Sequence, residues 1–86
     1  MSEGQPLLFY YRDGCHLCEE LASLLHRGWP EVFSQLHWRD VDRSNQWREN
    51  YGLKVPVLSR GTQVLCELQP DPACLREHFG PPDIPV

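Results

Sequence analysis

The first apolar segment of the chain is short and continuous. Residues 7–11 read Leu-Leu-Phe-Tyr-Tyr, a run typical of a strand that is buried on both faces and lies inside a sheet. The polar residues 12–14, which end in Gly14, interrupt this run. Apolar residues then recur at helical spacing and predict a helix that ends near Gly28 and Pro30. The residues of this apolar stripe are Leu17, Leu21, Leu24 and Leu25.

The middle of the chain predicts a second strand and a second helix. Residues 29–35 are ambiguous and are compatible with a further helical turn that packs on the sheet. Residues 36–41 alternate imperfectly between apolar and polar, as expected of a strand near a sheet edge. Ser44 is a suitable N-cap for a short helix, and Gly52 is a suitable residue to end it.

The next apolar segments predict a hairpin. Residues 55–58 form a strand entered through Pro56, and residues 63–66 form another. Only the turn residues 60–62 separate these segments, so the two strands must be antiparallel.

A final helix follows the hairpin. Asp71 is a favourable cap and Pro72 a favourable first helical residue. Gly80 and the two prolines after it end this helix, and residues 81–86 are expected to form a loose tail.

These elements follow one another in the order βαβαββα. A helix joins the first two strands, which are therefore parallel, and the hairpin adds antiparallel strands. The pattern predicts an α/β fold with a four-stranded mixed sheet and helices on both faces. A chain of 86 residues forms one domain, with its core over about 7–79.

Charge narrows the classes of partner. The net charge is −4 and Lys54 is the only lysine, so binding to nucleic acid or to an anionic membrane is disfavoured. The N-terminal residues lack the basic and apolar regions of a signal peptide. We therefore expect the protein to stay in the cytoplasm, and we also expect it to be a monomer.

The sequence Cys15-His16-Leu17-Cys18 lies at the predicted start of the first helix. Unpaired backbone N–H groups at a helix start favour a thiolate, so the pKa of Cys15 should fall. Cys18 lies three residues later, on the same side of the helix, from which it can attack a mixed disulfide on Cys15. A protonated His16 would add positive charge, and Glu19 and Glu20 would act in the opposite sense.

This pattern resembles the glutaredoxin-like branch of the thioredoxin superfamily, and most of all its short bacterial glutaredoxin-like members. The matching segments are Tyr11-Arg12-Asp13-Gly14-Cys15-His16-Leu17-Cys18, Val41-Asp42 and Tyr51-Gly52-Leu53-Lys54-Val55-Pro56-Val57-Leu58. The resemblance implies a thioredoxin-like fold and thiol–disulfide oxidoreductase activity. It also implies a disulfide-containing protein or a glutathione mixed disulfide as substrate, and a cellular thiol reductant.

The resemblance also implies roles for single residues. Cys15 matches the nucleophile and Cys18 the resolving cysteine. Pro56 matches a cis-proline that faces the dithiol, and Val55 matches the residue whose backbone pairs with bound peptide or glutathione. Arg12 matches a basic position that binds the glutathione carboxylate.

One turn departs from the family pattern. Glutaredoxins usually carry glycines and an acidic residue between the last strand and the last helix, where they hold the γ-glutamyl end of glutathione. Here the turn reads Leu68-Gln69-Pro70-Asp71. Asp71 can replace the acidic residue, but the glycines are missing. The resemblance therefore implies thiol–disulfide exchange more strongly than it implies glutathione as the substrate. Glutathione stays a possible co-substrate.

Other interpretations of the cysteines stay open. Cys15 and Cys18 could be buried apolar residues, or the four cysteines and a neighbouring histidine could form a zinc site. The spacing of Cys66 and Cys74 is not that of a zinc knuckle, so we expect no metal. We expect these two cysteines to be core or semi-buried residues, with a regulatory disulfide between them as the less favoured alternative. The alternative to an enzyme is a non-catalytic binding or redox-sensing module with the same fold.

Overall fold

A computed structural model describes residues 4–86 and contains a four-stranded mixed sheet with the order β2-β1-β3-β4. Residues 1–3 belong to the predicted domain of 86 residues but lie outside the described part. The strands are β1 (Leu7–Tyr11), β2 (Leu36–Asp40), β3 (Val57–Arg60) and β4 (Gln63–Glu67). The helices are α1 (His16–Gly28), α2 (Pro30–Ser34), α3 (Asn45–Tyr51) and α4 (Pro72–Phe79), with a 3-10 turn η2 (Val41–Arg43).

Strand β1 lies inside the sheet, as its continuous apolar run predicts. It pairs in parallel with β2 and antiparallel with β3, so that Leu8 lies between His37 and Ser59. β3 in turn pairs antiparallel with β4. The predicted βαβαββα order and mixed sheet are confirmed, and residues 30–34 form the further helical turn.

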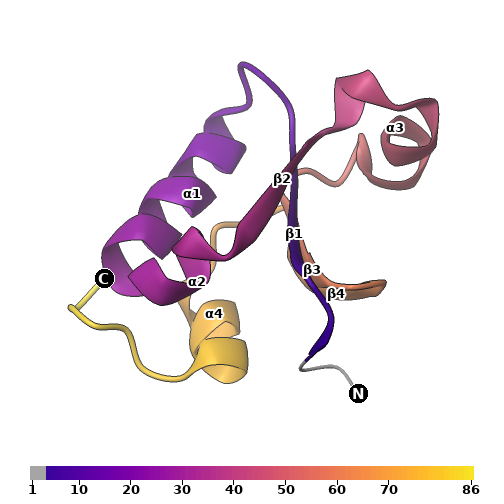
Figure 1. Cartoon of the computed structure of the whole chain (residues 1–86). Helices are drawn as coiled ribbons and strands as arrows, with labels where there is room; N and C mark the ends of the chain where they lie inside the picture. Colours follow the sequence, from indigo (N-terminus) through magenta and orange to yellow (C-terminus); the bar gives the residue numbers. More distant parts are fainter. Residues whose placement is uncertain (1–3) are drawn as a thin grey trace.

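The helices cover both faces of the sheet (Figure 1). Helices α1, α2 and α4 lie on one side, and α3 lies on the other. The larger core is built from inward side chains of the sheet with α1 and α4, and includes Phe9, Leu21 and Leu75. A smaller core around Tyr10 and Val57 packs against α3. Three residues of the predicted apolar stripe of α1, Leu21, Leu24 and Leu25, are buried in the larger core.

Strand bounds differ from the sequence prediction where a residue cannot continue the ladder. The third strand was expected over 55–58 but begins at Val57, because Pro56 has no N–H to donate. Its carbonyl instead accepts a hydrogen bond from the Leu68 N–H at 2.9 Å. The second strand ends at Asp40 rather than Val41, since the Asp40 carboxylate accepts from the Asp42 N–H and starts η2.

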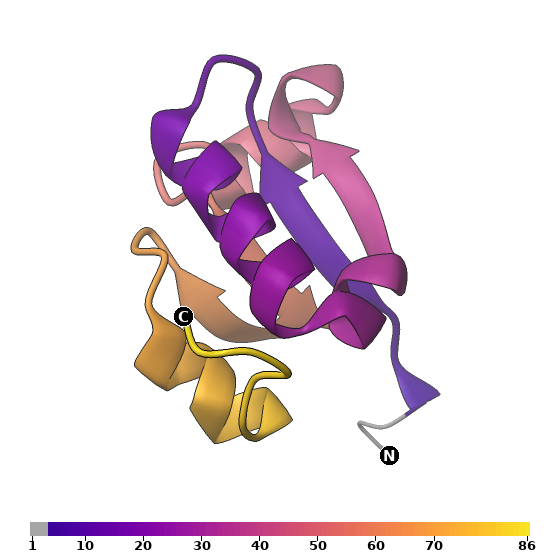
Figure 2. The same cartoon turned by 90° about the vertical axis from the view of Figure 1, so that its left-hand side faces the viewer.

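The end of the chain departs further from expectation. Residues 81–86 were predicted to form a loose tail, yet they lie against α1 (Figure 2). The Asp83 N–H donates to the Gly28 carbonyl at 2.6 Å, and Val86 packs against the larger core. The Trp29 indole N–H also donates to the Gly80 carbonyl. Gly28 permits this contact, because a Cβ there would lie 3.2 Å from side-chain atoms of Pro82 and Val86.

Candidate active site

Cys15 is the N-cap of α1 and is joined to Cys18 by a disulfide. Its Sγ accepts a hydrogen bond from the Cys18 N–H at 3.2 Å, and its own N–H donates to the Arg12 carbonyl. A cap position directs the side chain at backbone N–H groups that the helix leaves unpaired. The turn from β1 therefore places the sulfur of Cys15 at the positive end of α1.

The two sulfurs differ in exposure. Cys18 is 4% exposed and faces the core, whereas Cys15 is half-buried at the start of the helix. An incoming disulfide can therefore reach Cys15 more readily than Cys18. This asymmetry is the one that nucleophilic and resolving cysteines require.

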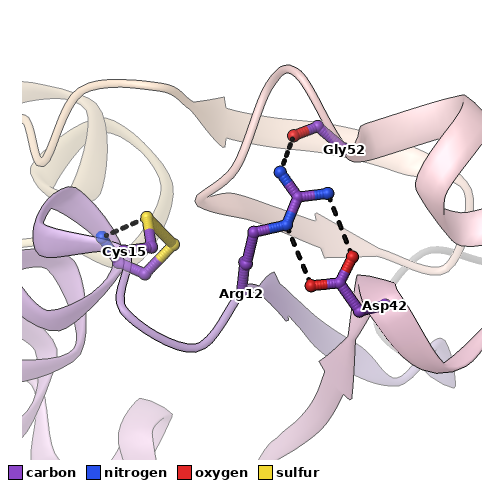
Figure 3. Close-up of a disulfide and its surroundings, with 5 residues drawn as sticks. Arg12, Cys15, Asp42 and Gly52 are labelled. Carbon is purple, nitrogen blue, oxygen red and sulfur yellow. Dashed lines mark hydrogen bonds and ion pairs between the residues drawn. A yellow bond between two sulfur atoms is a disulfide. The ribbon is translucent and has the colours of Figure 1, made fainter.

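The Arg12 side chain is directed toward Asp42 and Gly52 (Figure 3). Its Nε and Nη2 donate to the two carboxylate oxygens of Asp42 at 3.0 and 3.2 Å, and its Nη1 donates to the Gly52 carbonyl at 3.2 Å. The paired geometry uses the planar guanidinium fork fully. Arg12 thus links the loop before the dithiol to η2, which follows β2, and to the end of α3.

Asp42 is shared between two arginines. Arg48 donates to its carboxylate at 3.4 Å and to its backbone carbonyl at 2.9 Å. The hydrogen bond from Arg12 lowers the pKa of Asp42, and Arg48 lowers it further. Asp42 belongs to a segment that matched the family. Its pairing with Arg12 could not be predicted from the sequence, because the two residues lie 30 positions apart.

We expect Asp42→Asn to lower the urea midpoint of unfolding at neutral pH, because Arg12 and Arg48 lose an ionised partner. The pKa of Asp42 is lowered in the folded protein. Its contribution is therefore present above the unfolded-state pKa of about 3.9 and is lost as the pH falls through the lower folded-state pKa. Urea titrations over a pH series should show a difference between wild type and variant that narrows in acid.

Asp13→Asn is the matched control for this substitution, since Asp13 is an exposed aspartate in the turn that follows β1. If the urea midpoints of wild type and Asp42→Asn differed by the same amount down to strongly acidic pH, the ion pair would not be the cause of the difference.

A pocket of about 210 Å³ adjoins the dithiol. Cys18 and Arg12 line it together with the aromatic rings of Tyr11 and Trp38. The rings of Tyr11 and Trp38 meet edge to face with centroids 5.7 Å apart. Nothing in the sequence pattern singled out Trp38, which the parallel pairing of β1 with β2 places opposite Phe9, in the wall of the pocket beside Cys18.

The remaining residues proposed near the dithiol have defined positions. The His16 Nε2 lies 3.1 Å from a carboxylate oxygen of Glu20, one turn along an exposed face of α1. A protonated His16 would thus be neutralised by the glutamate expected to oppose it. Val55 packs against the smaller core, Pro56 is buried, and the peptide bond between them is cis.

A model of the family described as glutaredoxin-like domain (DUF836) matches residues 6–80. The chain belongs to this family. Searches among curated proteins and among solved structures gave no significant match. Within residues 4–86, no helix of this glutaredoxin-like domain has the length and hydrophobicity needed to cross a membrane.

In the turn before α4 of the glutaredoxin-like domain, the Asp71 side chain and the Leu68 backbone N–H already have hydrogen-bond partners within the protein. The Asp71 carboxylate accepts from the Ala73 N–H at 2.9 Å and so caps α4. Leu68 has a φ of 67°, in the left-handed region that favours glycine. Its N–H donates to the carbonyls of Lys54 and Pro56. The turn therefore keeps a backbone shape suited to glycine while carrying an exposed leucine.

The second cysteine pair corrects the sequence analysis. Cys66 is buried in the larger core and Cys74 packs against it, as expected, but in the glutaredoxin-like domain they also form the disulfide that was the less favoured alternative, with a Cα–Cα distance of 6.2 Å. Cys66 lies in β4 and Cys74 in α4. The disulfide links the last helix to the edge strand of the sheet. A spacing of eight residues does not reveal this pairing, because it depends on how α4 packs.

Proposed function

We propose that this chain is a thiol–disulfide oxidoreductase in which Cys15 is the nucleophile and Cys18 the resolving cysteine. The observation that supports this most is the position of Cys15, a half-buried N-cap whose Sγ accepts the Cys18 N–H at 3.2 Å. In the reduced protein the same N–H and the helix terminus favour a thiolate at Cys15. The thiolate is the form that attacks a disulfide.

The reaction that we propose has two exchange steps. The Cys15 thiolate attacks one sulfur of a substrate disulfide, and the other substrate sulfur leaves as a thiolate and takes up a proton. The Cys18 sulfur, after losing its proton, then attacks Cys15 and releases the second substrate thiol. The substrate has gained two electrons and two protons, and the protein has the Cys15–Cys18 disulfide. A cellular thiol reductant restores the dithiol.

We propose a disulfide-containing protein or a glutathione mixed disulfide as the substrate class. The aromatic pocket beside Cys18 suits an apolar side chain next to the substrate sulfur. For Arg12 to bind a glutathione carboxylate, it would have to exchange its contacts with Asp42. A cytoplasmic location would supply the thiol reductants that the cycle needs.

The second candidate function is a binding or redox-sensing module that does not turn over substrate. Two observations favour it. Arg12 is already paired with Asp42 and Gly52, and the turn at Leu68 and Asp71 is occupied by its own contacts. Both features leave fewer groups to hold glutathione than the resemblance implies.

Two assays separate these functions. One follows reduction of a small glutathione mixed disulfide by glutathione, and the other follows reduction of a protein disulfide coupled to thioredoxin reductase. We expect turnover in at least one of them. Absence of turnover in both, with a folded protein and an intact dithiol, would reject the enzyme and leave the module.

A further inference from the structure

The α4 helix brings a histidine to the second cysteine pair. Cys74 and His78 lie four residues apart on α4, and therefore on one face of the helix. Cys66 reaches the same place from β4 through the disulfide. Within residues 4–86, ligand atoms of Cys66, Cys74 and His78 all lie within 4.8 Å of one another. The group contains neither cysteine of the Cys15–Cys18 dithiol.

Two thiolates and one imidazole are a ligand set that zinc prefers. Zn–S bonds of about 2.3 Å and Zn–N bonds of about 2.0–2.1 Å place the ligands of a tetrahedral ion about 3.4–3.8 Å apart. The cluster is close enough for such a site once its two sulfurs separate. Disulfide formation and zinc binding are therefore mutually exclusive at these cysteines.

We propose that reduction of the Cys66–Cys74 disulfide creates a zinc site formed by Cys66, Cys74 and His78. Solvent exposure increases across the cluster, because Cys66 is buried, Cys74 is half-buried and His78 is exposed. The fourth coordination position would face solvent on the histidine side and hold a water molecule. The proposal does not depend on catalysis at Cys15.

The chemistry balances with a dithiol as reductant. The disulfide takes two electrons and two protons from the dithiol, which becomes a disulfide itself, and Cys66 and Cys74 become thiols. Zinc then replaces the two thiol protons and accepts the imidazole nitrogen of His78, so two protons are released for each ion bound. In the reduced thiol form, the Cys74 S–H can donate a hydrogen bond to the carbonyl of Leu65, which lies 3.1 Å from the Cys74 Sγ.

This exchange would leave α4 attached to the sheet in two of three states. The disulfide attaches the helix to β4 when the pair is oxidised, and the ion attaches it when the pair is reduced and loaded. Only the reduced, metal-free chain lacks a covalent or coordinate link there. The proposed site therefore makes the stability of the reduced protein dependent on zinc, because an ion that binds only the folded chain stabilises it.

The test uses the full chain with Cys15→Ser and Cys18→Ser, so that the dithiol cannot bind metal. The protein is reduced with a dithiol, which is then removed by gel filtration without oxygen. Zinc is titrated against a chromophoric chelator, and Co²⁺ is added in a parallel sample as a spectroscopic probe. We expect one zinc ion per reduced chain and a sulfur-to-cobalt charge-transfer band, with neither seen for the oxidised chain.

Substitution of His78 tests the ligand set without removing the cysteines. His78 is exposed, so His78→Gln should fold, and His37→Gln replaces another exposed histidine as the matched control. We expect His78→Gln to weaken zinc binding about tenfold or more, since one of three protein ligands is lost, and His37→Gln to leave it unchanged. Equal affinities in these two variants, or equal affinities in the reduced and oxidised chains, would overturn the proposal.

Discussion

Replacing Cys15 with serine is expected to lower turnover of the disulfide substrate by about 10³-fold or more. A serine hydroxyl at neutral pH is a far weaker nucleophile than a thiolate, and here it has no adjacent general base in the proposed reaction. The hydrogen bond from the Cys18 N–H at 3.2 Å can stabilise a thiolate at position 15 but cannot activate a hydroxyl to the same degree. Steady-state rates in whichever assay shows activity for the wild type measure the loss.

Two further variants show whether the effect belongs to the proposed order of steps. Cys18→Ser keeps the nucleophile but lacks the resolving thiol, so it should accumulate a mixed disulfide with substrate that mass spectrometry detects. Cys74→Ser is the control, because it removes a cysteine of the other disulfide. If Cys15→Ser retained the wild-type rate, or if only Cys74→Ser lost activity, the dithiol at the start of α1 would not be the active site.

The outcome of this test is separate from that of the zinc experiment. The oxidoreductase proposal uses Cys15 and Cys18, whereas the zinc site uses Cys66, Cys74 and His78. If the protein lacked turnover but bound zinc on reduction, the oxidoreductase proposal would be rejected and the zinc proposal would stand. If it turned over substrate but did not bind zinc, the reverse would hold.

Local patterns in the sequence were sufficient to predict most of the fold. The run at residues 7–11 predicted the internal strand, and the residues that start and end helices were recognised correctly at Ser44, Asp71 and Gly80. These features depend on neighbouring residues, such as the Ser44 Oγ that accepts the Trp47 N–H. Signals of this range can be read without knowing the tertiary structure.

Contacts between distant segments could not be predicted in the same way. The pairing of Arg12 with Asp42 requires the loop after β1 to meet η2, directly after β2, and the parallel register of the two strands brings these segments together. The Cys66–Cys74 disulfide requires α4 to fold back on β4. The sequence did not connect Arg12 with Asp42, and it offered the Cys66–Cys74 disulfide only as the less favoured alternative. The roles of the candidate site residues accordingly stay predictions until the variants are measured.

The largest effect on stability is expected from Leu21→Ala, at about 2–5 kcal/mol. Leu21 is fully buried in the larger core, one turn after Cys18 on the helix that carries the dithiol. Truncation removes apolar contacts and leaves a cavity between α1 and the sheet, which close-packed neighbours fill only in part. Against a total free energy of unfolding of about 4–13 kcal/mol for a chain of this length, the loss would be a large fraction. Urea or thermal denaturation of the oxidised protein measures it.

Leu53→Ala makes the same chemical deletion where the side chain is 95% exposed, so it should change the free energy of unfolding by no more than about 0.5 kcal/mol. The contrast between two leucines isolates burial from the intrinsic effect of the substitution. It also bears on the active site, because α1 both fills the core and presents Cys15 at its first turn. We expect the Leu21→Ala molecules that remain folded to keep the wild-type rate per folded chain, measured well below the midpoint of unfolding. Equal stability of the two variants would mean that α1 does not pack on the sheet as described, and the position of the Cys15 sulfur would then lose its structural basis.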